Sequence, residues 1–199
     1  MDYRILKIYI FSLPLTKFMQ ANTIRSLAVF CGSKTGANST FAHDAKKLGK
    51  IMCEHNVTLV YGGGSVGIMG LIADTVIEYK GKAIGVIPKV LVEWEREHKS
   101  LTQLVVVDDM HTRKKKMYDL CDAAIILPGG FGTLDELFEM VTWNQLSIHD
   151  KQIYILNSGG FYDNLIAHIN TMQGEGFLYE AAQERLTVIN EPSDMIKYF

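Results

Sequence analysis

The stretch from Ala123 to Phe138, AAIILPGGFGTLDELF, decides the fold class. It begins with five apolar residues, passes through a loop that contains three glycines, and continues into a helical pattern that we expect over Thr133–Leu146. A continuous apolar run is typical of a strand that is covered on both faces of a parallel sheet. The stretch therefore predicts one strand–loop–helix unit of an α/β domain.

The same alternation recurs along the chain from Ser26 onward. Apolar strand candidates lie at Ser26–Cys31, Val57–Tyr61, Ala83–Ile87, Gln103–Val107, Ala123–Leu127, Ile153–Leu156 and Leu186–Ile189. Amphipathic helix candidates lie between them at Ser39–His55, Gly67–Tyr79, Met110–Cys121, Thr133–Leu146 and Phe161–Gln173. This order predicts an α/β fold with a doubly wound, mostly parallel sheet flanked by helices, whose ligand lies at the carboxyl ends of the strands. We expect residues 25–199 to form a single domain, and residues 1–24 to form an N-terminal extension that packs on it or on a partner subunit.

Composition excludes several classes of protein. The 199 residues include 20 basic and 22 acidic side chains, so the net charge of -2 gives no electrostatic reason to bind nucleic acid or an anionic membrane. The apolar stretch Ile5–Leu15 is too short to cross a bilayer. Three cysteines without close pairs indicate a reducing, cytoplasmic location, and the absence of CxxC and HExxH patterns argues against a metal site.

Two of the glycine loops resemble better-known motifs and depart from them. The first, Cys31–Gly36, lacks the Gly-Lys pair of a P-loop. In the second, Gly62, Gly64 and Gly67 satisfy GxGxxG, but the next strand candidate ends without the acidic residue that a dinucleotide ribose requires. The second loop is therefore either a tight turn or an anion site at a helix N-terminus.

The third loop, Pro128–Glu136, combines glycines with the hydroxyl of Thr133 at the expected helix start. One interpretation is an anion site, with Asp135 or Glu136 performing chemistry beside the anion. The other is a structural capping box, in which Thr133 and Glu136 bond to each other's backbone N–H. Spacing alone does not decide between them.

A basic segment, Met110–Met117, opens the preceding helix candidate. Arg113 shares a helical stripe with Met117 and Cys121, and so lies on an otherwise apolar face. An arginine in that position needs a carboxylate or phosphate partner. We expect Lys115 and Lys116 to belong to a solvated face.

Together these segments resemble the LOG-type ("lonely guy") phosphoribohydrolases, a family formerly labelled lysine decarboxylase-like. The resemblance runs from about Ile24 to Phe177. It rests on PGGxGTxxE at Pro128–Glu136 and on VYGGGSVGIMG at Val60–Gly70. Shorter matches are GVIP at Gly85–Pro88, MHxRK at Met110–Lys114 and TWxQL at Thr142–Leu146.

The resemblance implies a Rossmann-like homodimer that hydrolyses the N-glycosidic bond of a cytokinin riboside 5′-monophosphate or of AMP. Free base and ribose 5-phosphate would be released without a cofactor or metal. It implies that Arg113 and Glu136 are catalytic; whether Arg113 binds phosphate, orients Glu136 or assists the departing base stays open. The substrate-binding positions it implies are Arg113, Lys114, Gly129, Gly130, Phe131, Gly132, Thr133, Leu134, Thr142 and, with a solvated helix end as the alternative, Glu95.

Two other functions compete with the hydrolase. A non-catalytic nucleotide sensor would use the same glycine loops but would not need both Arg113 and Glu136. A decarboxylase that depends on pyridoxal phosphate needs a Schiff-base lysine with an acidic partner, and no lysine here is arranged in that way. The sequence does not separate AMP from an N6-prenylated nucleotide as the substrate.

Overall fold

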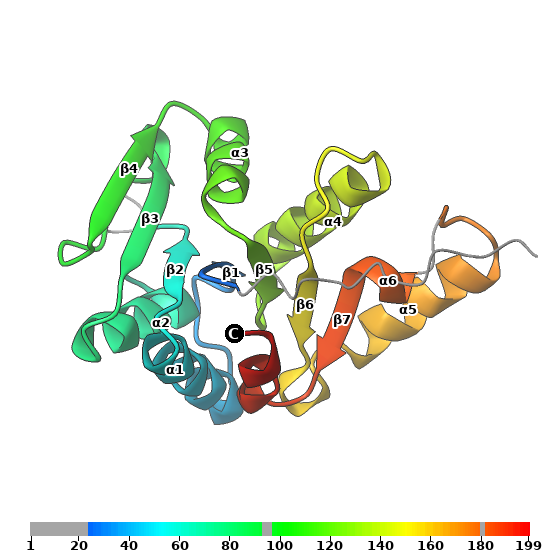
Figure 1. Cartoon of the computed structure of the whole chain (residues 1–199), viewed down its shortest axis with the longest axis horizontal. Coiled ribbons are helices and arrows are strands. Elements are labelled where there is room, and N and C mark those ends of the chain that lie inside the picture. Colours follow the sequence, from blue (N-terminus) through cyan, green and yellow to red (C-terminus); the bar gives the residue numbers. More distant parts are fainter. Residues whose placement is uncertain (1–23, 93–96, 180–181) are drawn as a thin grey trace, which may run out of the picture.

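The computed structural model describes residues 24–92, 97–179 and 182–199. Seven parallel strands form one sheet in the order β4-β3-β2-β1-β5-β6-β7 (Figure 1). The strands are β1 (Ser26–Phe30), β2 (Thr58–Tyr61), β3 (Ala83–Pro88), β4 (Gln103–Val107), β5 (Ala123–Ile126), β6 (Ile153–Leu156) and β7 (Leu186–Ile189). The chain moves outward from β1 to β4 and then returns to place β5 on the other side of β1. The predicted doubly wound, parallel architecture is confirmed.

The helices cover both faces of the sheet (Figure 1). They are α1 (Ser39–Glu54), α2 (Gly67–Glu78), α3 (Met110–Leu120), α4 (Phe131–Gln145), α5 (Asp163–Gly174) and the short α6 (Ala182–Arg185). Three 3-10 helices complete the described chain, at Lys89–Leu91, Ser158–Gly160 and Pro192–Tyr198. Among the described residues, no helix is long and apolar enough to span a membrane.

The sheet separates two apolar cores, and its inner strands contribute side chains to both. In β1, Leu27 and Val29 pack on the side of α1 and α2, whereas Ala28 and Phe30 pack on the side of α3, α4 and α5. The alternation of β-strand side chains thus buries both faces of the sheet, which explains why the strands are continuously apolar.

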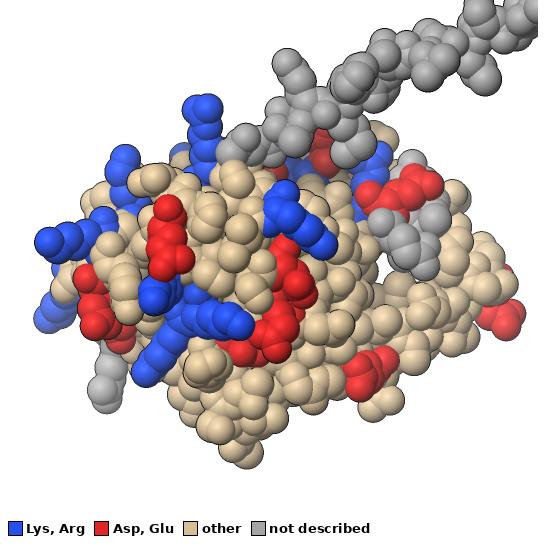
Figure 2. All heavy atoms as spheres, turned by 60° about the horizontal axis from the view of Figure 1, so that its bottom comes forward, with Lys and Arg blue, Asp and Glu red and all other residues tan. Residues whose placement is uncertain are grey.

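The outer surface over α1 and α2 carries mixed charge. Figure 2 shows this side of the molecule, with lysine and arginine side chains interspersed among aspartate and glutamate. Ion pairs join some of them, including Lys47 to Glu191 at 2.9 Å. Because opposite charges are interspersed on this face, their electrostatic potentials largely cancel.

Candidate functional site

The candidate site lies at the carboxyl ends of β1 and β5, where the strand order reverses. In doubly wound sheets, the crevice at this reversal binds ligands because the loops of the two neighbouring strands diverge there. Here the two loops contact each other, since the Gly32 N–H donates to the Pro128 carbonyl at 3.1 Å. The third glycine loop of the sequence therefore occupies the expected ligand position.

Helix α4 begins two residues earlier than the sequence predicts. Gly130 is its N-cap and supplies no side-chain hydrogen bond, so Thr133 occupies the third helical position. The capping-box interpretation of Thr133 and Glu136 is therefore wrong. The Thr133 side chain is instead buried against Gly129, where an added Cβ would stand 2.1 Å from Thr133 Oγ1.

The glycines of this loop serve two different purposes. Gly129 is required by internal packing, because its Cβ would also come within 2.9 Å of the Gly32 nitrogen. At Gly130 and Gly132, by contrast, a Cβ would meet nothing within 4 Å. The space in front of these two glycines is open, beside first-turn N–H groups that have no acceptor within their own helix. An anion could approach this backbone closely.

The second glycine loop is not an equivalent anion site. The N–H groups of Ile68 and Met69, in the first turn of α2, point to the Gly32 carbonyl at 3.1 and 3.4 Å. Gly67 adopts a positive φ of 61°, and its Cβ would stand 2.3 Å from the Ser33 carbonyl carbon. Of the two interpretations that the sequence left open, the structure supports the tight turn.

Arg113 is buried on the expected stripe with Met117 and Cys121. Asp109 caps α3 by accepting from the Thr112 N–H at 2.8 Å and from the Thr112 hydroxyl at 2.9 Å, and these hydrogen bonds lower the pKa of its carboxyl group. The cap places Arg113 in the first turns of α3, at the carboxyl edge of the sheet. Its Nε donates to the Val86 carbonyl at 3.1 Å, which fixes the side chain beneath the second glycine loop.

Glu136 is buried in the second turn of α4. Burial of the Tyr118 hydroxyl on α3, together with the negative charges of Glu139 and Glu136, raises the pKa of Tyr118 far above its ordinary value. Tyr118 therefore stays protonated. Within the described residues its hydroxyl has no hydrogen-bond partner, so it is a buried, neutral hydrogen-bond donor.

Lys114 connects α3 to α4. Its Nζ lies 3.1 Å from Asp135 Oδ2 and also pairs with Glu139 Oε2. Burial alone would lower the pKa of Lys114, but the hydrogen bonds from its ammonium group to Glu139 and Asp135 outweigh burial and raise it. Lys114 is thus a shielded cation held by two carboxylates that flank Glu136 in the sequence.

The remaining predicted site residues are dispersed. Phe131 is almost fully exposed at the start of α4, and Leu134 packs partly against the core. Thr142 lines an apolar cavity of about 210 Å³ between α4, α5 and β7, which contains neither Arg113 nor Glu136 among its lining residues. Glu95 lies outside the described residues, as does the predicted extension except for Ile24.

Sequence reasoning missed three residues of the site: Gly62, Glu139 and Tyr118. Glu139 had a usable signal, because residues three apart on a helix are neighbours and Glu136 is three residues earlier. No local signal could have joined Gly62 to Arg113, which are distant in the sequence. Within the described part of the chain there is no group of three histidine, cysteine, aspartate or glutamate residues that could hold a metal ion.

The fold and site define a Rossmann-like α/β domain with an open glycine loop between two helices that bear a buried arginine and a buried glutamate. The family described as "Possible lysine decarboxylase" matches residues 69–199. Curated relatives carry the name cytokinin riboside 5′-monophosphate phosphoribohydrolase. The chain belongs to this LOG family.

Two plant relatives illustrate the similarity. LOG3 of Arabidopsis thaliana is 41% identical over 179 residues, which cover 90% of this chain and 83% of the relative. The probable enzyme LOGL1 of Oryza sativa subsp. japonica is 45% identical over 167 residues, which cover 84% and 74%.

Solved structures share the fold at lower sequence identity. A molybdenum cofactor binding protein from Rippkaea orientalis aligns with a TM-score of 0.65 and 20% identity, covering 86% of this chain and 93% of that one. The molybdenum cofactor carrier protein of Chlamydomonas reinhardtii aligns with a TM-score of 0.63, 16% identity and the same coverage. At these identities the similarity concerns the fold alone.

Proposed function

We propose that this chain is a phosphoribohydrolase that cleaves the N-glycosidic bond of a cytokinin riboside 5′-monophosphate. Water adds at C1′ of the ribose, the bond from C1′ to the base breaks, and free base and ribose 5-phosphate are released. The observation that carries the proposal is a buried carboxylate, Glu136, in the second turn of a helix that has open space beside Gly130 and Gly132 at its N-terminus. A binding protein for a phosphorylated ligand gains nothing from a carboxylate in that place.

The residues have roles that fit this chemistry. Glycosidic cleavage passes through a transition state with positive charge on the sugar, which a carboxylate stabilises. Glu136 would supply that charge and orient the attacking water. The open backbone at Gly130–Thr133 would hold the 5′-phosphate and so fix the sugar relative to Glu136. Arg113 would contact the phosphate, the base or Glu136 itself.

A panel of nucleotides tests the proposal. The protein is incubated with AMP, with isopentenyladenosine 5′-monophosphate and with the two matching nucleosides, and the released bases are separated by chromatography. We expect base release from at least one nucleotide and much slower release from its nucleoside, which lacks the phosphate. Binding of nucleotides without release of base would overturn the proposal in favour of a sensor. The same panel decides whether the protein also acts as an AMP nucleosidase.

We also propose that the protein acts as a homodimer. An apolar cavity lies beside α4, and the exposed Phe138 lines it. Leu146, Ile148 and Phe177, which follow α4 and α5 in the sequence, are also exposed apolar side chains. A second copy that covers this face would remove apolar surface from water and would bring Thr142 toward a shared site. Light scattering of the purified protein gives the mass that tests this, with the monomer mass as the contrary result.

A cytoplasmic location completes the proposal. None of the three cysteines, Cys31, Cys53 and Cys121, forms a disulfide bond. Burial raises the pKa of Cys121 to about 11, which keeps it protonated and unreactive. Such thiols suit a reducing compartment. Microscopy of the full chain with a C-terminal fluorescent tag tests the location.

A further inference from the structure

The pairing of Lys114 with Glu139 differs from an ordinary surface ion pair. The two side chains are only 13% and 15% exposed, whereas Asp135, the other partner of Lys114, is 62% exposed. Exposed pairs contribute little because water and salt screen them. When one partner of a shielded pair is removed, an uncompensated charge remains in a poorly hydrated place. The contact between Lys114 and Glu139 is therefore the stronger constraint on how α3 and α4 lie together.

This constraint lies next to both candidate catalytic groups. Lys114 follows Arg113 directly on α3, and Glu139 is three residues after Glu136 on α4, close enough to be its neighbour on the helix surface. A shift of α4 along or around its axis at Glu139 must displace Glu136 as well. The pair thus sets the position of Glu136 relative to Arg113.

The pair also affects the local charge. Asp135, Glu136 and Glu139 place three carboxylates within two turns of one helix, and like charges at these spacings repel each other. Two of the three, Asp135 and Glu139, are in contact with the Lys114 ammonium group. Lys114 therefore allows a carboxylate-rich stretch of α4 to pack against α3.

We infer that Glu139 is a positioning residue, which holds Lys114 between α3 and α4 and thereby presents Arg113 and Glu136 to the same ligand. The inference rests on the proposed hydrolase function. It assigns Lys114 to the same positioning role, in place of the contact with substrate that family resemblance implies. Neither Lys114 nor Glu139 then touches the nucleotide.

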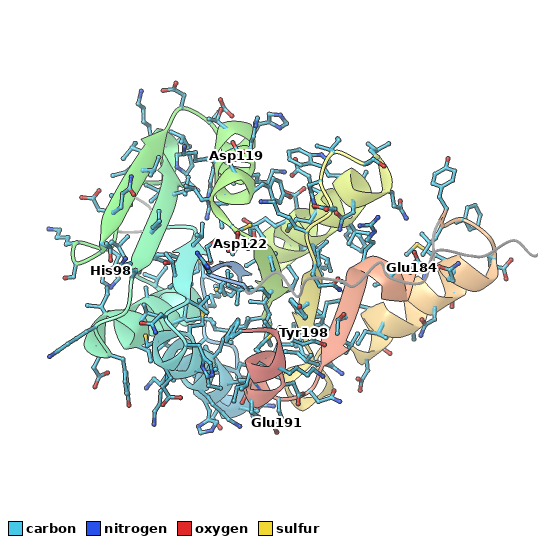
Figure 3. The ribbon with its side chains drawn as sticks, in the orientation of Figure 1. His98, Asp119, Asp122, Glu184, Glu191 and Tyr198 are labelled. Carbon is cyan, nitrogen blue, oxygen red and sulfur yellow. The ribbon has the colours of Figure 1, made fainter. Side chains whose placement is uncertain are left out.

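Steady-state kinetics of four variants test the inference: Glu139→Gln, Lys114→Met, the double variant that carries both changes, and Lys115→Met. Lys115 is the matched control, because it pairs with Asp119 on the same helix while both side chains are well exposed, at 63% and 54%. Figure 3 labels Asp119 on α3. Misplacement of catalytic groups by about 1 Å costs roughly 10²-fold in rate. We expect kcat to fall by about that factor in Glu139→Gln and Lys114→Met, while KM for the nucleotide changes little.

The double variant distinguishes positioning from direct binding. Because it removes both charges of the shielded pair and leaves only the exposed Asp135 without its partner, its kcat should be no lower than that of Lys114→Met. The two single effects should therefore not multiply. Lys115→Met should match the wild type. A higher KM in Lys114→Met, with normal kinetics in Glu139→Gln, would instead make Lys114 a ligand of the substrate and would overturn the inference.

Two further comparisons keep the outcomes separate. Thermal unfolding of each variant shows which variants fold. If a single variant does not fold, the double variant is compared with the wild type. A wild-type kcat in the double variant contradicts the positioning role. A wild-type protein that releases no base from any nucleotide ends the proposed function and this inference together. An active wild type with an equally active Glu139→Gln ends the inference alone.

Discussion

Gly62 lies against the guanidinium group of Arg113 so closely that no side chain fits between them. A Cβ on Gly62 would stand 1.9 Å from Arg113 Nη2. Gly62 follows β2 and Arg113 belongs to α3, so the contact joins two segments that are far apart in the sequence. The first glycine of the apparent dinucleotide motif therefore makes room for an arginine of the protein itself.

Substitution of Gly62 by alanine should reduce activity much more than stability. The new methyl group meets the flexible end of a side chain, so the guanidinium group moves while the backbone stays in place. We expect kcat/KM for nucleotide cleavage to fall by about 10²-fold, with the unfolding temperature little changed. Gly174→Ala is the control, because a Cβ there meets nothing within 4 Å. Normal turnover in Gly62→Ala would show that the position of Arg113 does not matter.

Alanine substitutions at Gly129 and Gly132 should have opposite effects. Gly129→Ala forces Thr133 and the Gly32 backbone apart, and we expect a loss of about 1–3 kcal/mol in the free energy of unfolding. Gly132→Ala has open space and improves helix propensity, so stability should be unchanged or higher by up to about 1 kcal/mol.

The same pair of variants tests the anion site. If phosphate approaches the backbone at Gly132, its new methyl group occupies that space and KM for the nucleotide should rise, although the fold is intact. Denaturant titration measures the stability of both variants and nucleotide kinetics measures KM. An unchanged KM in Gly132→Ala would move the phosphate away from this turn.

Neutralisation of Glu136 should separate binding from chemistry. Glu136→Gln keeps the shape of the side chain and removes the negative charge that would stabilise the sugar cation. We expect base release to fall by at least about 10²-fold, while calorimetry still detects nucleotide binding. Arg113→Ala should also lose activity. Wild-type release of adenine by Glu136→Gln would refute the catalytic role of this residue.

Much of the fold could be predicted from the sequence, because parallel strands buried on both faces leave a strong pattern. The strands Gln103–Val107, Ile153–Leu156 and Leu186–Ile189 have the predicted bounds, and the other strands differ by one residue at an end. Helix α4 is the informative exception. Threonine is a favoured N-cap, but here packing against Gly129 draws Thr133 into the helix and leaves Gly130 at the cap.

The site was predictable only in part, because its contacts are long-range. The burial of Arg113 followed from its helical stripe, and the glycine loop from its place after a strand. The clash that requires glycine at Gly62 and the ion pair between Lys114 and Glu139 depend on how α3 packs on its neighbours. Sequence spacing does not specify that packing, so these residues emerged only with the structure.

Asp122 holds the amino end of β1 to that of β5, opposite the candidate site. Its Oδ2 accepts hydrogen bonds at 2.9 Å from the backbone N–H of Arg25, from the N–H of Ser26 and from the Ser26 hydroxyl. Figure 3 labels Asp122. Asp122→Ala leaves these donors to water, and we expect the free energy of unfolding to fall by about 1–3 kcal/mol. Because the candidate catalytic groups lie at the other edge of the sheet, kcat and KM should stay at wild-type values at temperatures where the variant is folded.

Asp122→Asn is the matched variant for this prediction. It retains one oxygen acceptor without the negative charge, so its loss of stability should lie between that of the alanine variant and the wild type. Urea titration of the three proteins measures the series. Equal stability of all three proteins would mean that water replaces the hydrogen bonds of Asp122 at no cost. A lower kcat in fully folded Asp122→Ala would mean that the pairing of β1 with β5 affects the loops at Gly32 and Gly129.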